Sequence, residues 1–220
     1  MSMGTQAHTA ARVPARPLVQ PAARVVRGDT LKAAPWKNGG GVTREIAAYP
    51  VGASLETFVW RVSVADVGQA GPFSRFAGID RTLALLSGAG MLLDEAGGVT
   101  HALREPLAIA RFAGETAIDA RLVDGATRDF NLMVRRGAAT GDVDVWRDAH
   151  SAQLDANVVL LFCAQGELHV TTGDGASERT TTLVTNDTLR IDNARALACD
   201  VKGTGALLAV TIRYTEPPQA

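Results

Sequence analysis

A short run near the N-terminus combines residue types that hold small polar ligands. Trp36, Lys37 and Asn38 are followed by three glycines at 39–41 and then by Val42-Thr43-Arg44-Glu45. Lysine and asparagine supply hydrogen-bond donors for a carboxylate or phosphate, and glycine lets the backbone approach a bound group closely. An ordinary glycine-rich turn is the alternative, because short glycine runs are common. If the run is functional, we expect its first three residues to contact the ligand.

Three arginines farther along the chain are candidates for binding an anion, namely Arg61, Arg75 and Arg81. A guanidinium donates two parallel hydrogen bonds to a carboxylate and stays charged inside a pocket. Each arginine taken alone could instead form a structural ion pair, for example Arg61 with Glu45 or Arg81 with a partner near Asp80.

The remaining candidates are polar or aromatic residues on the same part of the chain. Ser63 and Asn131 are predicted to orient a ligand if they face the inside of the fold, and to be ordinary surface residues if they do not. Trp36 and Phe76 are predicted to form apolar walls, although a tryptophan beside a loop can also plug one end of a barrel. None of these residues is predicted to be catalytic.

The histidines do not form a metal site in the sequence pattern. They are widely separated, and no pair occurs at i and i+2: His8, His101, His150 and His169. A transition metal needs three or four converging nitrogen, sulfur or oxygen ligands, and arginines would repel a cation. We therefore expect no metal and no cofactor, and we expect His169 to be an exposed or hydrogen-bonded residue.

The composition describes one compact globular chain. Of its 220 residues, 46% are hydrophobic, and the net charge is -1. The near-neutral balance makes nucleic acid an unlikely partner and gives no attraction to an anionic membrane. No apolar run approaches the roughly 18 residues that a membrane-spanning helix needs. Cys163 and Cys199 lie in apolar stretches, which indicates buried thiols in a reducing compartment. These features predict a soluble protein.

Short apolar strands separated by glycine turns recur from Leu31 onward, which predicts an all-β fold. In residues 58–65, Phe58, Trp60, Val62 and Val64 fall on one face and Val59, Arg61, Ser63 and Ala65 on the other. In residues 129–134, Phe130, Leu132 and Val134 oppose Asp129, Asn131 and Met133. The best helix candidate is a weak one, a connector at residues 149–156.

The chain carries signs of an internal repeat. Residues 86–98 align with 162–175, residues 112–116 with 184–188, and residues 131–134 with 209–212, at offsets of about 76, 72 and 78. Nearly constant offsets predict two copies of a small antiparallel barrel packed together, while chance matching among valine- and glycine-rich segments is the alternative.

This organisation divides the chain into three parts. Residues 1–28 contain arginines and prolines but no acid, and we expect a disordered basic tail. Residues 29–145 are expected to form the first barrel and residues 146–216 a second, degenerate one. Buried polar groups need a partner, water or ligand. Because they concentrate in the first barrel, the site is expected there.

Four ordered motifs together resemble the HutD/Ves family of bacterial proteins. They are Pro35–Ile46, Trp60–Ser63, Gly71–Arg81 and Asp129–Gly137, and the resemblance extends over roughly Leu31 to Tyr214. It implies a bicupin fold, in which two jelly-roll barrels pack in one chain. It also implies a cytoplasmic protein with a regulatory role in histidine utilisation, through sensing an intermediate such as formylglutamate.

Two functional hypotheses of different classes follow. The first is a ligand-binding protein whose metal-free pocket captures a small-molecule carboxylate. The second is a metal-independent cupin enzyme, an isomerase or hydrolase, in which Glu45, Asp80 or Asp129 acts as general acid or base. A structural or interaction module without a ligand is a third possibility. Sheet edges left by such barrels are often covered in a homodimer, so we expect a homodimer.

Overall fold

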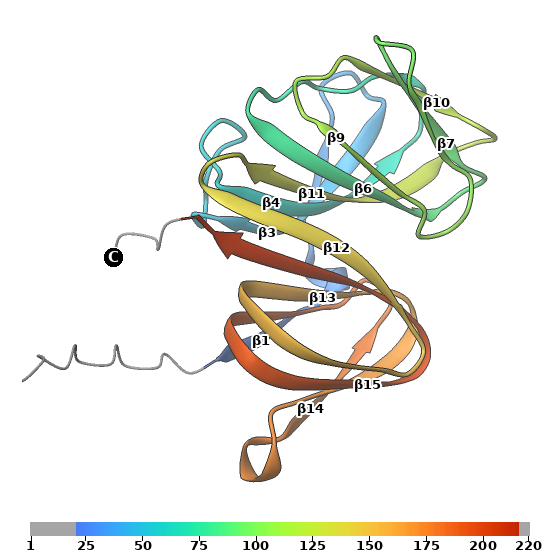
Figure 1. The fold of residues 1–220 in the computed structure, drawn as a ribbon. Coiled ribbons are helices and arrows are strands. Elements are labelled where there is room, and N and C mark those ends of the chain that lie inside the picture. The colour runs from blue at the N-terminus through green and yellow to red at the C-terminus, as the bar shows by residue number, and fades with distance from the viewer. Residues whose placement is uncertain (1–20, 216–220) are drawn as a thin grey trace, which may run out of the picture.

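The computed structural model describes residues 21–215, and this part of the chain is all-β, as predicted. Figure 1 shows two stacked groups of strands, with the long strand β12 running between them. Within residues 21–215 the only helical segments are the short 3-10 turns η1 (Gly28–Thr30) and η2 (Gly175–Ser177). No helix in this range has the length and apolar character needed to cross a bilayer.

The N-terminal group contains two antiparallel sheets. A six-stranded sheet has the order β2-β3-β4-β11-β6-β9, and a four-stranded sheet has the order β5-β10-β7-β8. Their bounds are β2 Ala33–Pro35, β3 Gly41–Tyr49, β4 Trp60–Val67, β5 Gly71–Pro72, β6 Ile79–Ser87, β7 Met91–Glu95, β8 Thr100–Leu103, β9 Ile109–Ala113, β10 Ile118–Leu122 and β11 Thr127–Arg135.

The C-terminal group is one sheet built around two very long strands. Its strands are β1 Ala22–Val26, β12 Ala139–Arg147, β13 His150–Thr172, β14 Arg179–Val184 and β15 Thr188–Tyr214, in the order β1-β15-β13-β14 with β12 also paired to β15. Residues 158–162 of β13 pair with residues 188–192 and also with residues 208–212 of β15. The central segment of β13 therefore lies between two segments of β15 and is hydrogen-bonded to β15 along both of its edges.

The predicted alternation of side chains is confirmed within β4 and β11, but Phe58 precedes β4 and packs with Ile79 and Met133 instead of with Trp60. Trp60, Val62, Phe130 and Leu132 are buried in a cluster that joins the six-stranded sheet to β13 and β15. In this cluster, the rings of Phe130 and Phe162 lie 5.1 Å apart. The opposite face of the same strands looks toward the four-stranded sheet, where a second apolar cluster fills one end of the space. The other end is left for polar residues.

Several predicted boundaries are wrong. The expected tail includes residues 22–26, but these form β1, which pairs antiparallel with β15; residues 1–20 of that prediction lie outside the described part. The expected boundary after residue 145 falls inside β12, which pairs with β15 along its whole length. The first and last strands of residues 21–215 therefore belong to the same sheet.

The helix expected at residues 149–156 is also wrong. This segment forms the start of β13, where exposed Ser151, Gln153 and Asp155 alternate with less exposed or buried neighbours. The period of two and pairing with β15 outweigh the helix propensity of the alanines. The repeat-aligned segments do occupy strands and turns in both groups, but two closed barrels stay a prediction.

Both cysteines are buried and free, as predicted from their apolar surroundings. Burial raises the pKa of Cys163 and that of Cys199 to about 11, so neither is a reactive thiolate at neutral pH.

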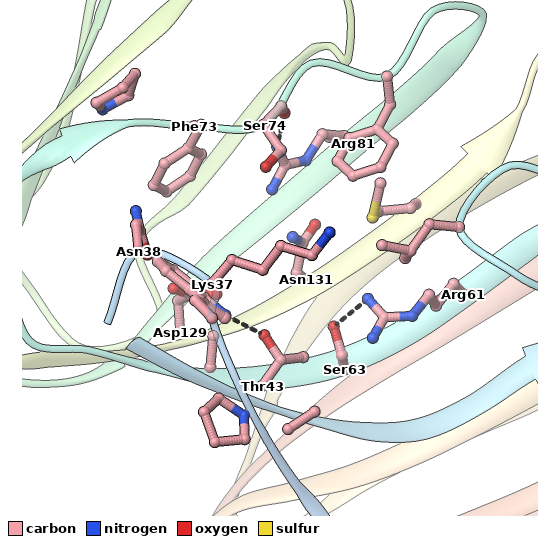
Figure 2. A pocket seen from close by; sticks show the side chains of 18 residues that line it. Lys37, Asn38, Thr43, Arg61, Ser63, Phe73, Ser74, Arg81, Asp129 and Asn131 are labelled. Carbon is pink, nitrogen blue, oxygen red and sulfur yellow. Dashed lines mark hydrogen bonds between the residues drawn. The ribbon is translucent and has the colours of Figure 1, made fainter. Parts of the chain in front are cut away.

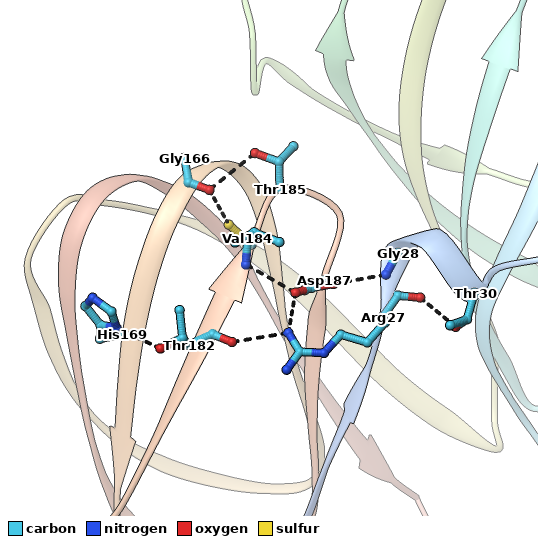
Figure 3. A network of polar contacts seen from close by, with 10 residues as sticks. Arg27, Gly28, Thr30, Gly166, His169, Thr182, Val184, Thr185 and Asp187 are labelled. Carbon is cyan, nitrogen blue, oxygen red and sulfur yellow. Dashed lines mark hydrogen bonds and ion pairs between the residues drawn. The ribbon is translucent and has the colours of Figure 1, made fainter.

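A buried carboxylate fastens the N-terminal segment to the C-terminal sheet (Figure 3). Asp187 accepts hydrogen bonds from the Gly28 N–H at 3.0 Å, the Val184 N–H at 3.2 Å and Arg27 Nη1 at 2.6 Å. Burial opposes its ionisation, but these donors together lower the pKa of Asp187 below its ordinary value. The carboxylate therefore stabilises the native state above its unfolded pKa, and this stabilisation is lost as the pH falls through its folded pKa.

We predict that Asp187→Ala lowers the free energy of unfolding by about 2 to 4 kcal/mol at pH 7, because it leaves two backbone N–H groups without their acceptor. Urea denaturation measures this loss. The matched control is Asp155→Ala, which removes an exposed ion pair with Arg195 at 3.4 Å and should change stability by less than about 0.5 kcal/mol. Equal losses in the two variants would show that Asp187 does not fasten the segment.

Candidate functional site

A cavity of about 650 Å³ opens on the inner face of the six-stranded sheet (Figure 2). Eight of the nine predicted ligand-binding residues line it: Trp36, Lys37, Asn38, Arg61, Ser63, Phe76, Arg81 and Asn131. Figure 2 shows Lys37 extending over the cavity from the turn between β2 and β3, while Arg61, Ser63, Arg81, Asp129 and Asn131 come from strands of the sheet. Residues distant in the sequence are thus brought together, although their role in binding stays a prediction.

The strand register explains why these side chains share one surface. Because successive residues of a strand point to opposite faces, every second residue of β4 and β11 faces the cavity. Three cross-strand rows run from β4 through β11 to β6: Arg61–Met133–Arg81, Ser63–Asn131–Leu83 and Ala65–Asp129–Leu85. All of these residues except Leu83 and Leu85 line the cavity. The two arginines therefore lie in one row, separated by a methionine.

Arg81 is a buried cation that makes few polar contacts. The residue is only 7% exposed, and its Nη1 donates a hydrogen bond to the Ser74 carbonyl at 3.4 Å. The guanidinium carbon lies 5.2 Å from the ring centre of Phe73, 5.9 Å from Phe76 and 5.1 Å from Phe112. Its Nε is buried without a hydrogen-bond partner among the described residues. A guanidinium held this way has unused capacity for an anion.

Burial lowers the pKa of Arg81 to about 10; the negative charge of Asp129 opposes this change, and the positive charge of Arg61 adds to it. Arg81 is still protonated at neutral pH. The cavity floor therefore carries a desolvated positive charge that a ligand carboxylate would stabilise.

Arg61 combines the two roles considered for it. Its Nε pairs with Glu45 Oε2 at 2.8 Å, so the structural ion pair is present, and its Nη1 donates to Ser63 Oγ at 3.3 Å. It also lines the cavity, but less of its hydrogen-bonding capacity is free than in Arg81. The ion pair considered for Arg81 near Asp80 is not formed with Asp80, because Asp80 pairs with Arg136 at 2.6 Å.

Arg75 is the one predicted site residue that the structure does not bring to the cavity. It is exposed, and its Nε donates to the Glu115 carbonyl at 3.0 Å. Its neighbour Phe76 does line the cavity. Arg75 and Phe76 lie in the connection between β5 and β6, where no strand pattern fixes the direction of a side chain, so the choice between them needed the structure.

The glycine run forms a hairpin turn and does not itself line the cavity. Within the turn, the Trp36 N–H donates to the Gly41 carbonyl at 2.9 Å, and the Gly40 N–H donates to Asn38 Oδ1 at 3.1 Å. A Cβ on Gly41 would lie 2.6 Å from the Asp66 carbonyl oxygen, so this position requires glycine. The glycines let the chain enter the sheet, and Trp36, Lys37 and Asn38 line the cavity.

Asp129 is the acidic residue of the lining. It is 2% exposed, and within residues 21–215 no hydrogen bond or ion pair reaches its carboxylate. Burial raises the pKa of Asp129 to about 7, against the opposing charge of Arg81 and with a further increase from Asp66. The sequence placed it on the inner face of its strand, but it was considered only as a possible catalytic acid.

Besides Asp129, nine lining residues were not predicted as site residues, and four of them carry a hydroxyl, an aromatic ring or a thioether: Thr43, Phe73, Ser74 and Met133. Thr43 fixes the tryptophan, because its Oγ1 accepts from Trp36 Nε1 at 2.7 Å. Each lies within a motif or strand face that the sequence had singled out, so the signal was present but gave no means of ranking residues. Asn131, which was predicted, has a buried Oδ1 without a partner in the described part of the chain.

The lining does not fit a transition-metal site. Its ionisable groups are one carboxylate, two guanidinium groups and one ammonium group, with no imidazole or thiol. The residues from 21 to 215 hold no group of three histidine, cysteine or acidic side chains that could converge on a metal. This donor set suits an anion better than a cation.

Comparison with known proteins agrees with the motif resemblance. The model of the HutD family matches residues 28–209. An uncharacterized 21.2 kDa protein in the hutC 3' region of Pseudomonas putida is 33% identical over 191 residues, which cover 86% of this chain and 98% of that protein. Protein Ves of Citrobacter koseri is 36% identical over 111 residues, about half of each chain.

Solved structures give the same result. HutD from Pseudomonas fluorescens SBW25, determined in a formate condition, is 32% identical with a TM-score of 0.77, over 89% of this chain and 100% of that one. A conserved protein of unknown function from Pseudomonas aeruginosa PAO1 is 31% identical with a TM-score of 0.80, over 87% and 99%. Ylba from E. coli, at 10% identity and a TM-score of 0.65, shares the cupin-like fold alone. Family model, relatives and structures thus agree that the chain belongs to the HutD family.

Proposed function

We propose that this protein binds a small carboxylate in the cavity, with Arg81 as the principal partner of the negative charge. The observation that carries the proposal is the buried guanidinium of Arg81, which faces the cavity and has an unpaired Nε. Burying a charge without a full set of partners is costly, and such groups are found where a ligand completes them.

The rest of the cavity supports a small ligand of this class. Its volume of about 650 Å³ falls within the range of about 300 to 1,000 Å³ that is usual for small-molecule sites. Trp36, Phe73 and Phe76 provide apolar walls, and Lys37 at the mouth adds a further positive charge on a flexible side chain. Ser63 and Asn131 supply polar groups that fix the orientation of a ligand.

We also propose a cellular role in sensing an intermediate of histidine utilisation, formylglutamate among the candidates. The support is the family assignment, together with the P. putida relative named for the hutC 3' region. HutD from P. fluorescens was solved in a formate condition, and formate is the smallest carboxylate. In this account the two groups of strands are two cupin units, of which the N-terminal one holds the ligand.

A second candidate function is a metal-independent isomerase or hydrolase that acts on a carboxylate. Asp129 favours it, because a buried acid with a pKa near neutrality lies beside the cationic floor. The other two acids considered are not in the lining and are engaged elsewhere, Glu45 with Arg61 and Asp80 with Arg136. Asp129 is therefore the acid that such a reaction would use.

Ligand binding is tested by calorimetry and thermal shift with formate, glutamate, formylglutamate, urocanate and histidine. We predict that at least one carboxylate raises the melting temperature of the wild type, because a ligand that binds only the native state stabilises it. Arg81→Met should weaken that binding by at least about tenfold, since a charged hydrogen bond contributes about 1.5 to 3 kcal/mol.

The chain offers a matched control for this experiment in Arg75→Met, which removes an exposed arginine outside the cavity and should leave the affinity unchanged. Asn131→Leu gives a second cavity variant in case Arg81→Met does not fold. No binding of any of these ligands at millimolar concentration, or equal weakening by Arg81→Met and Arg75→Met, would rule out this form of the proposal.

The ionisation of Asp129 should appear in the pH dependence of stability. Its folded pKa of about 7 lies above the unfolded value of about 3.9, so its contribution is fully favourable below about pH 4 and is lost as the pH rises through 7. We predict that Asp129→Asn becomes more stable relative to wild type by about 2 to 4 kcal/mol between pH 4 and pH 8. Urea denaturation across this range measures the difference, and parallel curves would contradict it.

The enzymatic alternative has a separate readout. A mixture of the same carboxylates is followed by NMR with wild type and with Asp129→Asn. Turnover by the wild type alone would favour the enzyme, whereas an unchanged mixture in the presence of a bound ligand would favour binding.

A further inference from the structure

We propose that Asp129 binds the carboxylate ligand in its protonated form, so that capture of one anion takes up one proton from solution. This inference rests on the proposed carboxylate binding and adds a determinant of specificity to it. Asp129 would donate its O–H to a ligand oxygen while Arg81 neutralises the ligand's charge.

The position of Asp129 carries the first step. It lies on β11, on the same face as Asn131, in the cross-strand row between Ala65 and Leu85, two apolar residues. It lines the same cavity as Arg81 (Figure 2). Within the described part of the chain its carboxylate has no hydrogen-bond partner, although the residue is only 2% exposed. An acid in this setting has its hydrogen-bonding capacity directed at the cavity.

The charged groups around Asp129 leave Arg81 as the main one that favours its ionised form from within the cavity. On β4, Arg61 is paired with Glu45 of β3, and Asp66 is paired with Arg44 of β3. Arg128, the preceding residue of β11, lies 3.6 Å from Asp66. From the turn between β2 and β3, Lys37 is exposed at the mouth.

A bound carboxylate changes this balance. Once it pairs with Arg81, the guanidinium no longer compensates Asp129, and the ligand adds a second negative charge beside it. Two carboxylates in one buried site do not both stay ionised, and one of them is protonated. Because burial already raises the pKa of Asp129 to about 7, a modest further increase keeps its proton bound at physiological pH.

The protonated acid also contributes to selectivity. A carboxylic O–H donates a short hydrogen bond of about 2.5 to 2.7 Å to a carboxylate oxygen, which is stronger than a bond between neutral groups. An ionised Asp129 would instead repel the ligand. The affinity for a carboxylate should therefore fall as the pH rises above the pKa of the free site.

The test is isothermal titration calorimetry of the full-length protein with formate and formylglutamate between pH 5.5 and 8.5. At each pH, two amine buffers with different ionisation enthalpies give the number of protons exchanged. We expect almost no proton uptake at pH 5.5 and an uptake approaching one proton at pH 8. Above pH 7 the affinity should weaken by about tenfold per pH unit.

Two variants sharpen the result. Asp129→Asn carries a permanent N–H donor in place of the O–H, so it should bind with no proton uptake, with an affinity independent of pH, and about tenfold more tightly than wild type at pH 8. Asp80→Asn is the matched control, because this acid of β6 pairs with Arg136 and is not among the lining residues. It should retain the proton uptake of the wild type.

The outcomes separate this inference from the proposed function. Wild-type binding without proton uptake at pH 8, or loss of binding in folded Asp129→Asn at every pH, would overturn the role of Asp129 and leave carboxylate binding intact. Absence of carboxylate binding by the wild type at every pH would overturn both. If Asp129→Asn does not fold, the proton count of the wild type decides.

Discussion

The pleat of the six-stranded sheet is the constraint on which the rest of this structure depends. Along β4 and β11, the residues that pack against the C-terminal group are apolar and buried, from Trp60 to Val64 and from Phe130 to Val134, and the residues between them face the N-terminal interior. A shift of one residue in β4 would move Arg61 into the apolar cluster and Trp60 out of it, and the same shift in β11 would exchange Asn131 and Phe130. The packing between the two groups of strands therefore fixes the register of the site.

On the interior face, this register places the ionisable groups of Arg81 and Asp129 among apolar side chains. Arg81 is surrounded by three aromatic rings and Asp129 by apolar row neighbours, yet the structure forms no ion pair between them. A direct pair would satisfy both groups and leave nothing for a ligand. Holding them apart in one cavity costs stability and leaves a cation and an acid available, which is the usual compromise at a functional site.

Much of this arrangement could be predicted from the sequence, because it follows from local patterns. The faces of β4 and β11 were readable from alternation in residues 58–65 and 129–134, and the turn at 36–41 from its glycines. The predictions that were wrong concerned segments whose structure depends on pairing with strands far away in the sequence. Residues 22–26 contain nothing that identifies them as a strand of the distant C-terminal sheet, and β12 belongs to that sheet only through its partner β15. Arg75 and Arg81 were equivalent as sequence, and only burial among the phenylalanines separates them.

The most direct measurement is a crystal structure of the protein with formate or formylglutamate bound. The account predicts a carboxylate in the N-terminal cavity, with an oxygen about 2.7 to 2.9 Å from a guanidinium nitrogen of Arg81 and a second contact to Asp129. A ligand bound elsewhere on the molecule, or one in the cavity whose carboxylate points away from Arg81, would contradict it.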